Sequence, residues 1–432
     1  MAPFPVSNST VSFWRQNTHV LDDHRTTPEV PAEVDIAVIG TGYAGVSTVY
    51  HMLQSCKERN AAPPSIVFLE ARQACSGATG RNGGHLKPDP YNHPSAIAAT
   101  HGVEAAAEVA KFEVDHVAAV KKAVDDEGIN CDLVLTRCTD TFLTQDLNLR
   151  MQQGIQMLRD HQVPEAERLV CAEGEQAEQV SGVKGAKGCV SYTTAHLFPY
   201  KLVMGLLSKL LDSGVVNLQT HTPVSKVDKS PDPEGYIVIT TARGVVRAKK
   251  LIYATNAYTA ALLPEFEGKI VPVRGVCCHI VPEREPASPL TNSYIIRQGD
   301  LEYDYLIPRL DGSIIVGGAK SRYYHDKDSW YGNVEDDKMI EGGKAHFDGY
   351  MQRTFRGWED SGASISKIWT GSHGMPQVFL SAKGLAAMVL QGESFANTGI
   401  PKIFEATQQR LDNPRNAILE AWEAGQHTKG KS

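Results

Sequence analysis

Hydrophobic positions follow a regular order in the first hundred residues. Residues 34–40 (VDIAVIG) form a continuous apolar run that ends in glycine, which is typical of a parallel strand covered on both faces. A helix is predicted from about residue 44 to residue 57, because the breaker sequence NAAPPS follows it. Residues 65–70 (SIVFLE) predict a second buried strand. The folded part of the chain therefore begins with a strand–helix–strand unit.

The pattern changes twice further along the chain. Residues 101–128 and 148–160 have helical spacing and predict helices with an exposed face. A long helix is predicted after Pro199, followed by two strands joined by a turn near residue 243. After residue 270, strand patterns alternate with turns such as Asp311-Gly312. This last part predicts a mainly antiparallel sheet.

Length and charge limit the classes of protein. The 432 residues exceed what one hydrophobic core usually serves, so two domains are expected. The net charge is −7 and no Lys/Arg run is long enough to follow a phosphate backbone, which argues against nucleic-acid binding. Residues 1–33 lack a secretory pattern and are interpreted as an irregular leader with two aromatics able to pack, Phe13 and Trp14. No apolar run reaches transmembrane length, so no membrane partner is expected.

Cysteine usage points away from metals and disulfides. The eight cysteines show neither Cys-x-x-Cys pairing nor a His/Cys cluster with zinc-ligand spacing, so no metal site is expected. The neighbours Cys277 and Cys278 are interpreted as a buried strand pair, because nothing nearby in the sequence would lower a thiol pKa. A reducing compartment, the cytoplasm, fits best, and the expected partner is a small molecule.

A glycine loop connects the first strand to the first helix. Gly40, Gly42 and Gly45 in GTGYAG have the Gly-x-Gly-x-x-Gly spacing. Such a loop turns tightly, lets a pyrophosphate approach the backbone and lets helix pack on strand, while the helix N-terminus attracts the phosphates. Glu70 ends the next strand, where a carboxylate accepts hydrogen bonds from ribose hydroxyls and disfavours the 2′-phosphate of NADP. The alternative is a glycine-rich turn beside an ordinary surface acid.

A second glycine loop favours a flavin over a nicotinamide as the cofactor. Residues 76–85 (SGATGRNGGH) contain four glycines and other small residues around Arg81. A nicotinamide-binding fold has no use for this loop, whereas a buried flavin needs backbone close to both its pyrophosphate and its ring. Arg81 is expected to offset phosphate charge or donate to the ring, and Ser76 or Thr79 to bind phosphate. The alternative is a flexible surface loop.

These motifs, with LIYATNAYT, YLIPRLDGSIIVGG and SHGMP, resemble the D-amino-acid-oxidase-like FAD-dependent oxidoreductases. The branch holding gamma-glutamylputrescine oxidase and related fungal proteins is the most similar, and the resemblance covers about residues 11–413. It implies an α/β fold (α+β overall) in which a Rossmann-like FAD-binding domain is interleaved with an antiparallel-sheet substrate domain. The expected segments are a leader (1–33), the FAD-binding domain (34–100, 186–270 and a shortened 367–413), the helical and substrate domain (101–185 and 271–366) and a tail (414–432).

The resemblance also implies which residues meet FAD. The two glycine loops hold the pyrophosphate and run to the flavin ring, Glu70 holds the ribose, Val224 contacts adenine, and residues 373–375 approach the ring from the C-terminal side. The cofactor residues carried over are Gly40, Gly42, Tyr43, Ala44, Gly45, Glu70, Ala71, Arg72, Ser76, Gly77, Ala78, Thr79, Arg81, Asn82, Gly83, Gly84, Leu86, Val224, Ala254, Thr255, Gly374 and Met375. No cysteine or histidine stands out for covalent attachment of the flavin.

The implied reaction is oxidation of a carbon–nitrogen bond in a small amine or amino acid. Hydride passes to the flavin, the imine is hydrolysed, and O2 reoxidises the cofactor. His85 and His373 are the candidate catalytic residues, although His85 can equally cap its loop and His196, before the helix, is interpreted as structural. Three residues on predicted strands are expected either to bind a substrate carboxylate or to have an ordinary structural role on a face of the sheet. They are Arg274, Tyr305 and Arg309.

One stretch departs from the family pattern. In the relatives, a few dozen residues, including a strand, separate the Trp-Thr-Gly element from the Gly-His-Gly-Met-Pro element. Here Gly371 joins directly to Ser372 in KIWTGSHGMPQVF. Either the protein is an oxidase that closes its site by another route, or it keeps the FAD fold with weak or no turnover. A nucleotide-binding scaffold is a third reading, and loss of a strand should expose a sheet edge.

Overall fold

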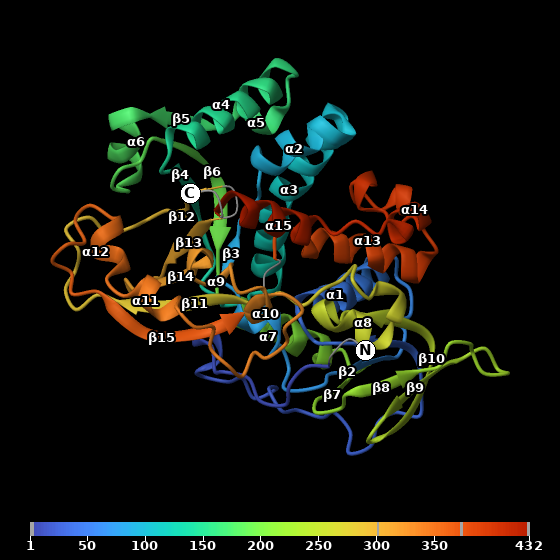
Figure 1. The fold of residues 1–432 in the computed structure, drawn as a ribbon. Coiled ribbons are helices and arrows are strands. Elements are labelled where there is room, and N and C mark those ends of the chain that lie inside the picture. The colour runs from blue at the N-terminus through green and yellow to red at the C-terminus, as the bar shows by residue number, and fades with distance from the viewer. Residues whose placement is uncertain (1–3, 300–301, 372–374, 430–432) are drawn as a thin grey trace.

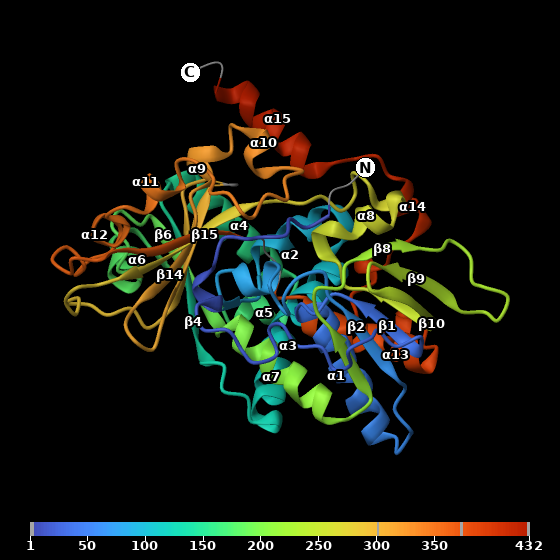
Figure 2. The same ribbon diagram turned by 90° about the horizontal axis from the view of Figure 1, so that it is seen from below.

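The computed structural model describes residues 4–299, 302–371 and 375–429, with side chains up to residue 425. Within these residues the fold has two β-sheets with helices packed around them (Figure 1). The small sheet has six strands in the order β7-β2-β1-β10-β9-β8, and the large sheet has nine, in the order β15-β11-β14-β13-β12-β4-β6-β3 with β5 paired to β6. In Figure 2 the large sheet lies on the left and the small sheet on the right.

The strands of the small sheet are β1 (Glu33–Ile39), β2 (Ile66–Leu69), β7 (Val216–Gln219), β8 (Val224–Val227), β9 (Ile237–Thr241) and β10 (Gly244–Tyr253). Those of the large sheet are β3 (His85–Leu86), β4 (Val134–Phe142), β5 (Val170–Glu173), β6 (Gly188–His196), β11 (Gly275–Val281), β12 (Ser293–Arg297), β13 (Tyr303–Pro308), β14 (Ile314–Gly318) and β15 (Ser364–Gly371). The longer helices are α1 (Tyr43–Glu58), α2 (Asn92–His101), α3 (Val103–Glu127), α4 (Gln145–Asp160), α6 (Gly174–Ser181), α7 (Pro199–Asp212), α13 (Val378–Gln391) and α15 (Ala417–Lys429). The short ones are α5 (Pro164–Glu167), α8 (Thr259–Leu262), α9 (Lys320–Tyr323), α10 (Lys327–Trp330), α11 (Gly343–Phe347), α12 (Tyr350–Thr354) and α14 (Gln408–Asp412).

The predicted strand–helix–strand unit is confirmed. β1 pairs in parallel with β2 and β10, and α1 connects β1 to β2. Residues 36–39 of β1 and all of β2 are buried, which explains their unbroken apolar sequence. α1 packs against α7 and α13, and α13 also meets α3. The first glycine loop therefore lies between a buried strand and a helix that is fixed on two sides.

The small sheet has an open edge. On its side away from β1, β10 pairs with β9 only through residues 244–248 among the described strands. Residues 250–253 pair with β1 and have no partner on the β9 side among the described strands, and the side chain of Lys250 reaches the carbonyl of Val389 in α13. That a lost segment causes this open edge stays a prediction.

The large sheet confirms the antiparallel pattern after residue 270. β11 pairs with β15 on one side and with β14 on the other, β14 pairs with β13, and β13 pairs with β12, all antiparallel. β12 pairs with β4 in parallel. β6 and the short β3 also belong to this sheet, although residues 186–270 and 34–100 were assigned to the cofactor domain. The chain therefore crosses between the two sheets more often than the expected segments imply.

The two ends of the described chain pack on the fold. Trp14 of the leader is fully buried, and its Nε1 donates to the Asn82 carbonyl at 2.5 Å. The segment expected only as a tail contains α15, where the Trp422 Nε1 donates to the Tyr324 carbonyl at 2.7 Å. Leader and tail are thus parts of the fold.

No helix in the described residues combines the length and the apolarity needed to cross a membrane. In the same residues, no group of three or more His, Cys, Asp and Glu side chains has the arrangement of a metal site. All eight cysteines are free thiols, and Cys277 and Cys278 are buried on β11, as the sequence predicted. Burial raises the pKa of Cys277 to about 11.

Candidate cofactor site

The first glycine loop is held by backbone contacts that leave no room for side chains. Gly40 has a φ of +105°, and a Cβ at this position would lie 2.7 Å from the Ala254 carbonyl oxygen. A Cβ on Gly45 would lie 2.3 Å from the Gly40 carbonyl oxygen. Because both obstacles are backbone, only glycine allows this approach of β1, α1 and β10.

The N-terminus of α1 is capped from the second glycine loop. Its N-cap residue, Gly42, contributes no side-chain hydrogen bond. The Tyr43 amide instead donates to Thr79 Oγ1 at 2.9 Å. The two loops are therefore joined at the helix end that carries the partial positive charge.

Glu70 ties the first glycine loop to the segment that leads into the second. It follows β2 directly, and its Oε2 accepts from the Thr41 amide at 2.9 Å and from Thr41 Oγ1 at 2.7 Å. Its Oε1 accepts from the Arg72 amide at 3.1 Å. A carboxylate has acceptor capacity beyond three bonds, so ribose binding by Glu70 stays a prediction that this geometry permits.

The second glycine loop is an ordered turn. Asn82 Nδ2 donates to the Thr79 carbonyl at 2.9 Å, and the Gly84 amide donates to Asn82 Oδ1 at 2.8 Å. Around Gly77, by contrast, a Cβ would meet no atom within 4 Å. The loop is fixed by its own amide side chain and leaves open space on one side.

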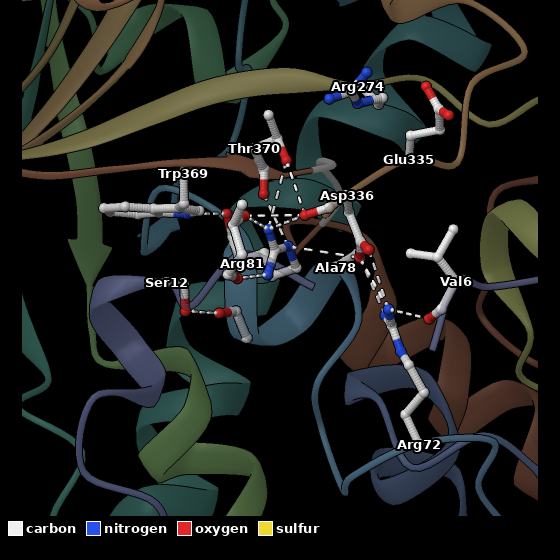
Figure 3. A network of polar contacts seen from close by, with 12 residues as sticks. Val6, Ser12, Arg72, Ala78, Arg81, Arg274, Glu335, Asp336, Trp369 and Thr370 are labelled. Atoms are coloured by element: carbon white, nitrogen blue, oxygen red, sulfur yellow. Dashed lines mark hydrogen bonds and ion pairs between the residues drawn. The ribbon is translucent and has the colours of Figure 1, made fainter. Parts of the chain in front are cut away.

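Two buried arginines, Arg72 before this loop and Arg81 within it, share one acid, Asp336 (Figure 3). Arg72 forms two parallel bonds to the Asp336 carboxylate, both at 3.1 Å. Arg81 donates Nε to the Thr370 carbonyl at 2.8 Å and Nη2 to the Asp336 carbonyl at 3.1 Å, and it also bonds Thr10. Burial lowers the pKa of Arg81 to about 10. For Arg72 the same penalty is outweighed by Asp336, which raises the pKa.

These elements surround one cavity of about 520 Å³, a size usual for small-molecule sites. The predicted cofactor residues that line it are Gly40, Gly42, Tyr43, Ala44, Glu70, Ala71, Arg72, Gly77, Ala78, Thr79, Arg81, Asn82, Val224, Ala254, Thr255 and Met375. Those that do not are Gly45, Ser76, Gly83, Gly84 and Leu86. Gly374 and the candidate catalytic His373 lie outside the described residues.

Part of the lining has no signal in the sequence. Phe4 and Pro5 of the leader, Tyr258 after β10, and Asn333 and Asp336 of the large-sheet domain meet the glycine loops at this cavity. They come from distant segments, and no residue spacing links them. Only the aromatics at 13 and 14 hinted that the leader packs.

The substrate candidates separate into two groups. Arg274 lines the cavity, but it precedes β11 and does not lie on a strand. Its Nη1 donates to the Ser329 carbonyl at 3.1 Å, while its buried Nε has no hydrogen-bond partner among the described residues. Burial lowers the Arg274 pKa. Tyr305, on β13, and Arg309, just past its end, do not line the cavity.

Arg309 is engaged elsewhere. Its Nη2 bonds Asp132 at 2.8 Å. The rings of Phe13, Trp14 and Phe198 surround its guanidinium at 5.2 to 5.4 Å. A contact with substrate in the cavity would require this cluster to break.

The histidines near the second loop lie behind it. His85 begins β3, its ring is 5.4 Å from that of Tyr305, and it does not line the cavity. Burial lowers the His85 pKa to about 3. His196 ends β6 opposite His85 and does not begin a helix, since α7 starts at Pro199. Its pKa is lowered to about 4 by burial, so both rings are neutral.

The C-terminal side of the cavity is packed tightly. Trp369 Nε1 donates to the Arg81 carbonyl at 2.8 Å, and a Cβ on Gly371 would lie 2.2 Å from that oxygen. After the junction, His116 Nε2 of α3 accepts from the Leu380 amide at 3.0 Å. Glu113 Oε1 accepts from Gln377 Nε2 at 2.6 Å. Helix α3 thereby holds the first turn of α13, which brings Met375 and Val378 to the cavity.

The two loops, the α1 N-terminus between them and the cavity define a dinucleotide-binding protein, and the open space beside the backbone at Gly77 fits the pyrophosphate of FAD. The chain belongs to the family DAO, FAD dependent oxidoreductase, whose family model matches residues 35–386. FAD is therefore its cofactor.

Several known proteins are similar to this chain in sequence or in fold. The chain is 22% identical over 296 residues to gamma-glutamylputrescine oxidoreductase of Escherichia coli (strain K12), a match that covers 66% of this chain and 64% of that protein. The structure is similar to glycine oxidase from Geobacillus kaustophilus, with a TM-score of 0.63, 16% identity and coverage of 84% and 96% of the two chains. It is also similar to L-alpha-glycerophosphate oxidase from Mycoplasma pneumoniae with FAD bound, with a TM-score of 0.53, 12% identity and coverage of 79% and 83%. These likenesses to solved structures show the fold.

Proposed function

We propose that this FAD-dependent oxidoreductase oxidises a carbon–nitrogen bond of a small amine or amino acid, with O2 as the final acceptor. One observation carries the proposal: one cavity joins the two glycine loops to Arg274, whose buried Nε meets no acceptor in the part of the chain that the structure describes. A small anionic group in this cavity would supply the acceptor that Nε lacks. The name of the Escherichia coli relative, an oxidoreductase of an amine, agrees with this class.

The roles of the chain's residues follow from their contacts. The α1 N-terminus with Gly40 and Gly42 would hold the diphosphate, and Glu70 the ribose. Arg274 would bind a substrate carboxylate, in a buried setting where its charge is weakly screened. When bound, FAD supplies a two-electron acceptor.

In the proposed reaction, the carbon–nitrogen bond is oxidised and the resulting imine is hydrolysed. The substrate carbon beside nitrogen loses a hydride, and the nitrogen loses a proton to solvent. Water then adds to the imine and gives a carbonyl compound and an amine or ammonia. The two electrons, with two protons, reduce O2 to hydrogen peroxide.

A second candidate is a protein that keeps the FAD fold with weak or no turnover. The packing of Trp369 and Gly371 on the Arg81 carbonyl favours it, because this contact fills the space beside the second loop. His85 and Tyr305 also lie off the cavity, so neither meets a ligand in it.

The absorption spectrum of the purified protein tests both candidates. A yellow protein that bleaches when an amine or amino acid is added without oxygen, and forms hydrogen peroxide in air, supports the oxidase. A yellow protein that no amine or amino acid bleaches supports the second candidate. A colourless protein that cannot be reconstituted with FAD contradicts both.

A further inference from the structure

Asp336 is the meeting point of three separate segments. It lies between α10 and α11 in the large-sheet domain, 264 residues from Arg72 and 255 from Arg81. Its carbonyl oxygen accepts from the Thr10 amide at 2.8 Å and from Thr10 Oγ1 at 2.9 Å. The leader, the second glycine loop and the large-sheet domain therefore converge on one residue.

The side chain of Asp336 fixes the first arginine. Its two oxygens face the two terminal nitrogens of Arg72, each at 3.1 Å, which is the planar geometry that binds guanidinium most strongly. Arg72 Nη1 also donates to the Val6 carbonyl at 3.1 Å. The pair thus holds the chain just after Glu70, where the cavity begins.

The backbone of Asp336 fixes the second arginine. Its carbonyl accepts from Arg81 Nη2 at 3.1 Å, and its carboxylate lies 3.8 Å from Arg81 Nε. Arg81 has no shorter carboxylate contact among the described residues, since its other bonds go to oxygens of Thr10 and Thr370. Part of its positive charge stays uncompensated next to the cavity.

All three residues are buried, with exposures of 5% for Arg72, 2% for Arg81 and 9% for Asp336, and all three line the cavity. A buried charged side chain that loses its partner destabilises the fold, and we expect it to change position. The chain is consequently held at Arg72, just before the second glycine loop, and at Arg81, within it, by one acid of the other domain (Figure 3).

We propose that Asp336 is a positioning residue for FAD: it holds Arg72, just before the second glycine loop, and Arg81, within it, at the wall of the cavity, so that the positive charge of Arg81 acts on the cofactor diphosphate. This proposal rests on FAD as the cofactor and is independent of the substrate.

The experiment compares Asp336→Asn with a matched pair elsewhere. Arg297 forms an equally buried, two-pronged bond to Asp140, at 2.9 Å for Nε and for Nη2, and neither residue lines the cavity. The FAD dissociation constant of each full-length variant is measured by flavin fluorescence, together with its melting temperature. Asp336→Asn is expected to weaken FAD binding at least about tenfold, whereas Asp140→Asn lowers the melting temperature and keeps the FAD affinity.

A conservative variant covers the case in which Asp336→Asn does not fold. Asp336→Glu keeps the charge but displaces the carboxylate, so it should fold and bind FAD with an affinity between those of the wild type and a variant without the acid. If either Asp336 variant binds FAD as tightly as the wild type while its melting temperature falls as in Asp140→Asn, Asp336 is only structural and the proposal is overturned.

Discussion

The lining of the cavity consists of two parts that are built differently. The glycine-loop wall, residues 40–44 and 70–82, is assembled from neighbouring turns by backbone contact. The distal wall is assembled from segments far apart in the chain, namely residues 4–5, 270–274, 333–336, 371, 375 and 378. The first depends on the absence of side chains, and the second on buried polar contacts such as those of Asp336 and His116.

This difference predicts unequal responses to substitution. Changes in the glycine-loop wall collide with backbone, which cannot give way, so they should act on the fold itself. Changes in the distal wall remove hydrogen bonds worth about 1 kcal/mol each when a partner is lost, so they should act mainly on FAD affinity.

The largest effect is expected for Gly45→Ala, directly behind the glycine-loop wall, whose Gly40 it supports. The new Cβ would lie 2.3 Å from the Gly40 carbonyl oxygen and 3.2 Å from Ala254 Cβ, so β1, α1 and β10 would have to separate. We expect a loss of about 3 kcal/mol or more in unfolding free energy and no bound flavin. Soluble yield, chemical denaturation and absorbance of the purified protein measure this.

Gly425→Ala in α15 is the matched control, because a Cβ there meets no atom within 4 Å. It should retain flavin and gain slightly in stability. A Gly45→Ala protein that is yellow and as stable as Gly425→Ala would contradict the steric account of the glycine-loop wall.

The same contrast explains what the sequence could predict. Gly40, Gly42, Gly45 and Glu70 belong to a local unit whose spacing follows from its geometry, and the structure reproduces that unit. The contact of Asp336 with Arg72 spans 264 residues and has no local pattern. The sequence predicts one role, binding of a substrate carboxylate, for Arg274, Tyr305 and Arg309, yet only Arg274 reaches the cavity. Which of these residues line the cavity depends on contacts between distant segments, and no local pattern in a single sequence predicts those contacts.

The next effect concerns acidic pH. Burial lowers the pKa of His51 to about 4, of His85 to about 3 and of His196 to about 4, from an ordinary value of 6.5. As the pH falls below 6.5 the unfolded chain binds protons that the folded chain does not, so stability decreases until about pH 4. Each histidine contributes about 1.4 kcal/mol per pH unit in that window.

Melting temperatures between pH 7.5 and pH 4.5 test this expectation. His196→Gln removes one titrating group from behind the glycine-loop wall, so its melting temperature should fall less steeply with decreasing pH than that of the wild type. Equal slopes for the two proteins would mean that His196 is not held neutral by burial.

A smaller effect is expected at the first turn of α13. His116 Nδ1 bonds the Phe112 carbonyl at 2.7 Å and must donate, which leaves Nε2 to accept from the Leu380 amide. His116→Ala should cost about 1–2 kcal/mol in unfolding free energy and weaken FAD binding several-fold, because Met375 and Val378 lose their anchor. His116→Gln, with an acceptor oxygen in place of Nε2, should restore much of the affinity.

His161 offers the control for His116. Its Nδ1 bonds the carbonyl of Met157 at 2.8 Å in the same local arrangement, but the ring is exposed. His161→Ala should leave FAD binding unchanged. If His116→Ala also binds FAD as the wild type does, the anchoring of α13 by α3 has no bearing on the cofactor.

The smallest effect is expected where the two loops meet. Thr79→Val removes the acceptor of the Tyr43 amide, 2.9 Å from Thr79 Oγ1, and so removes the cap of α1. The expected cost is about 1 kcal/mol of unfolding free energy, with FAD affinity reduced a few-fold.

Thr144→Val is the control, because it removes the equivalent cap of α4. There Thr144 Oγ1 accepts from the Leu147 amide at 3.4 Å, far along the chain from either loop. Chemical denaturation should give similar losses for the two variants, while flavin titration should detect a change only in Thr79→Val. Equal FAD affinities would show that the bond between the loops serves the helix and not the cofactor, and the glycine-loop wall would then depend on its glycines alone.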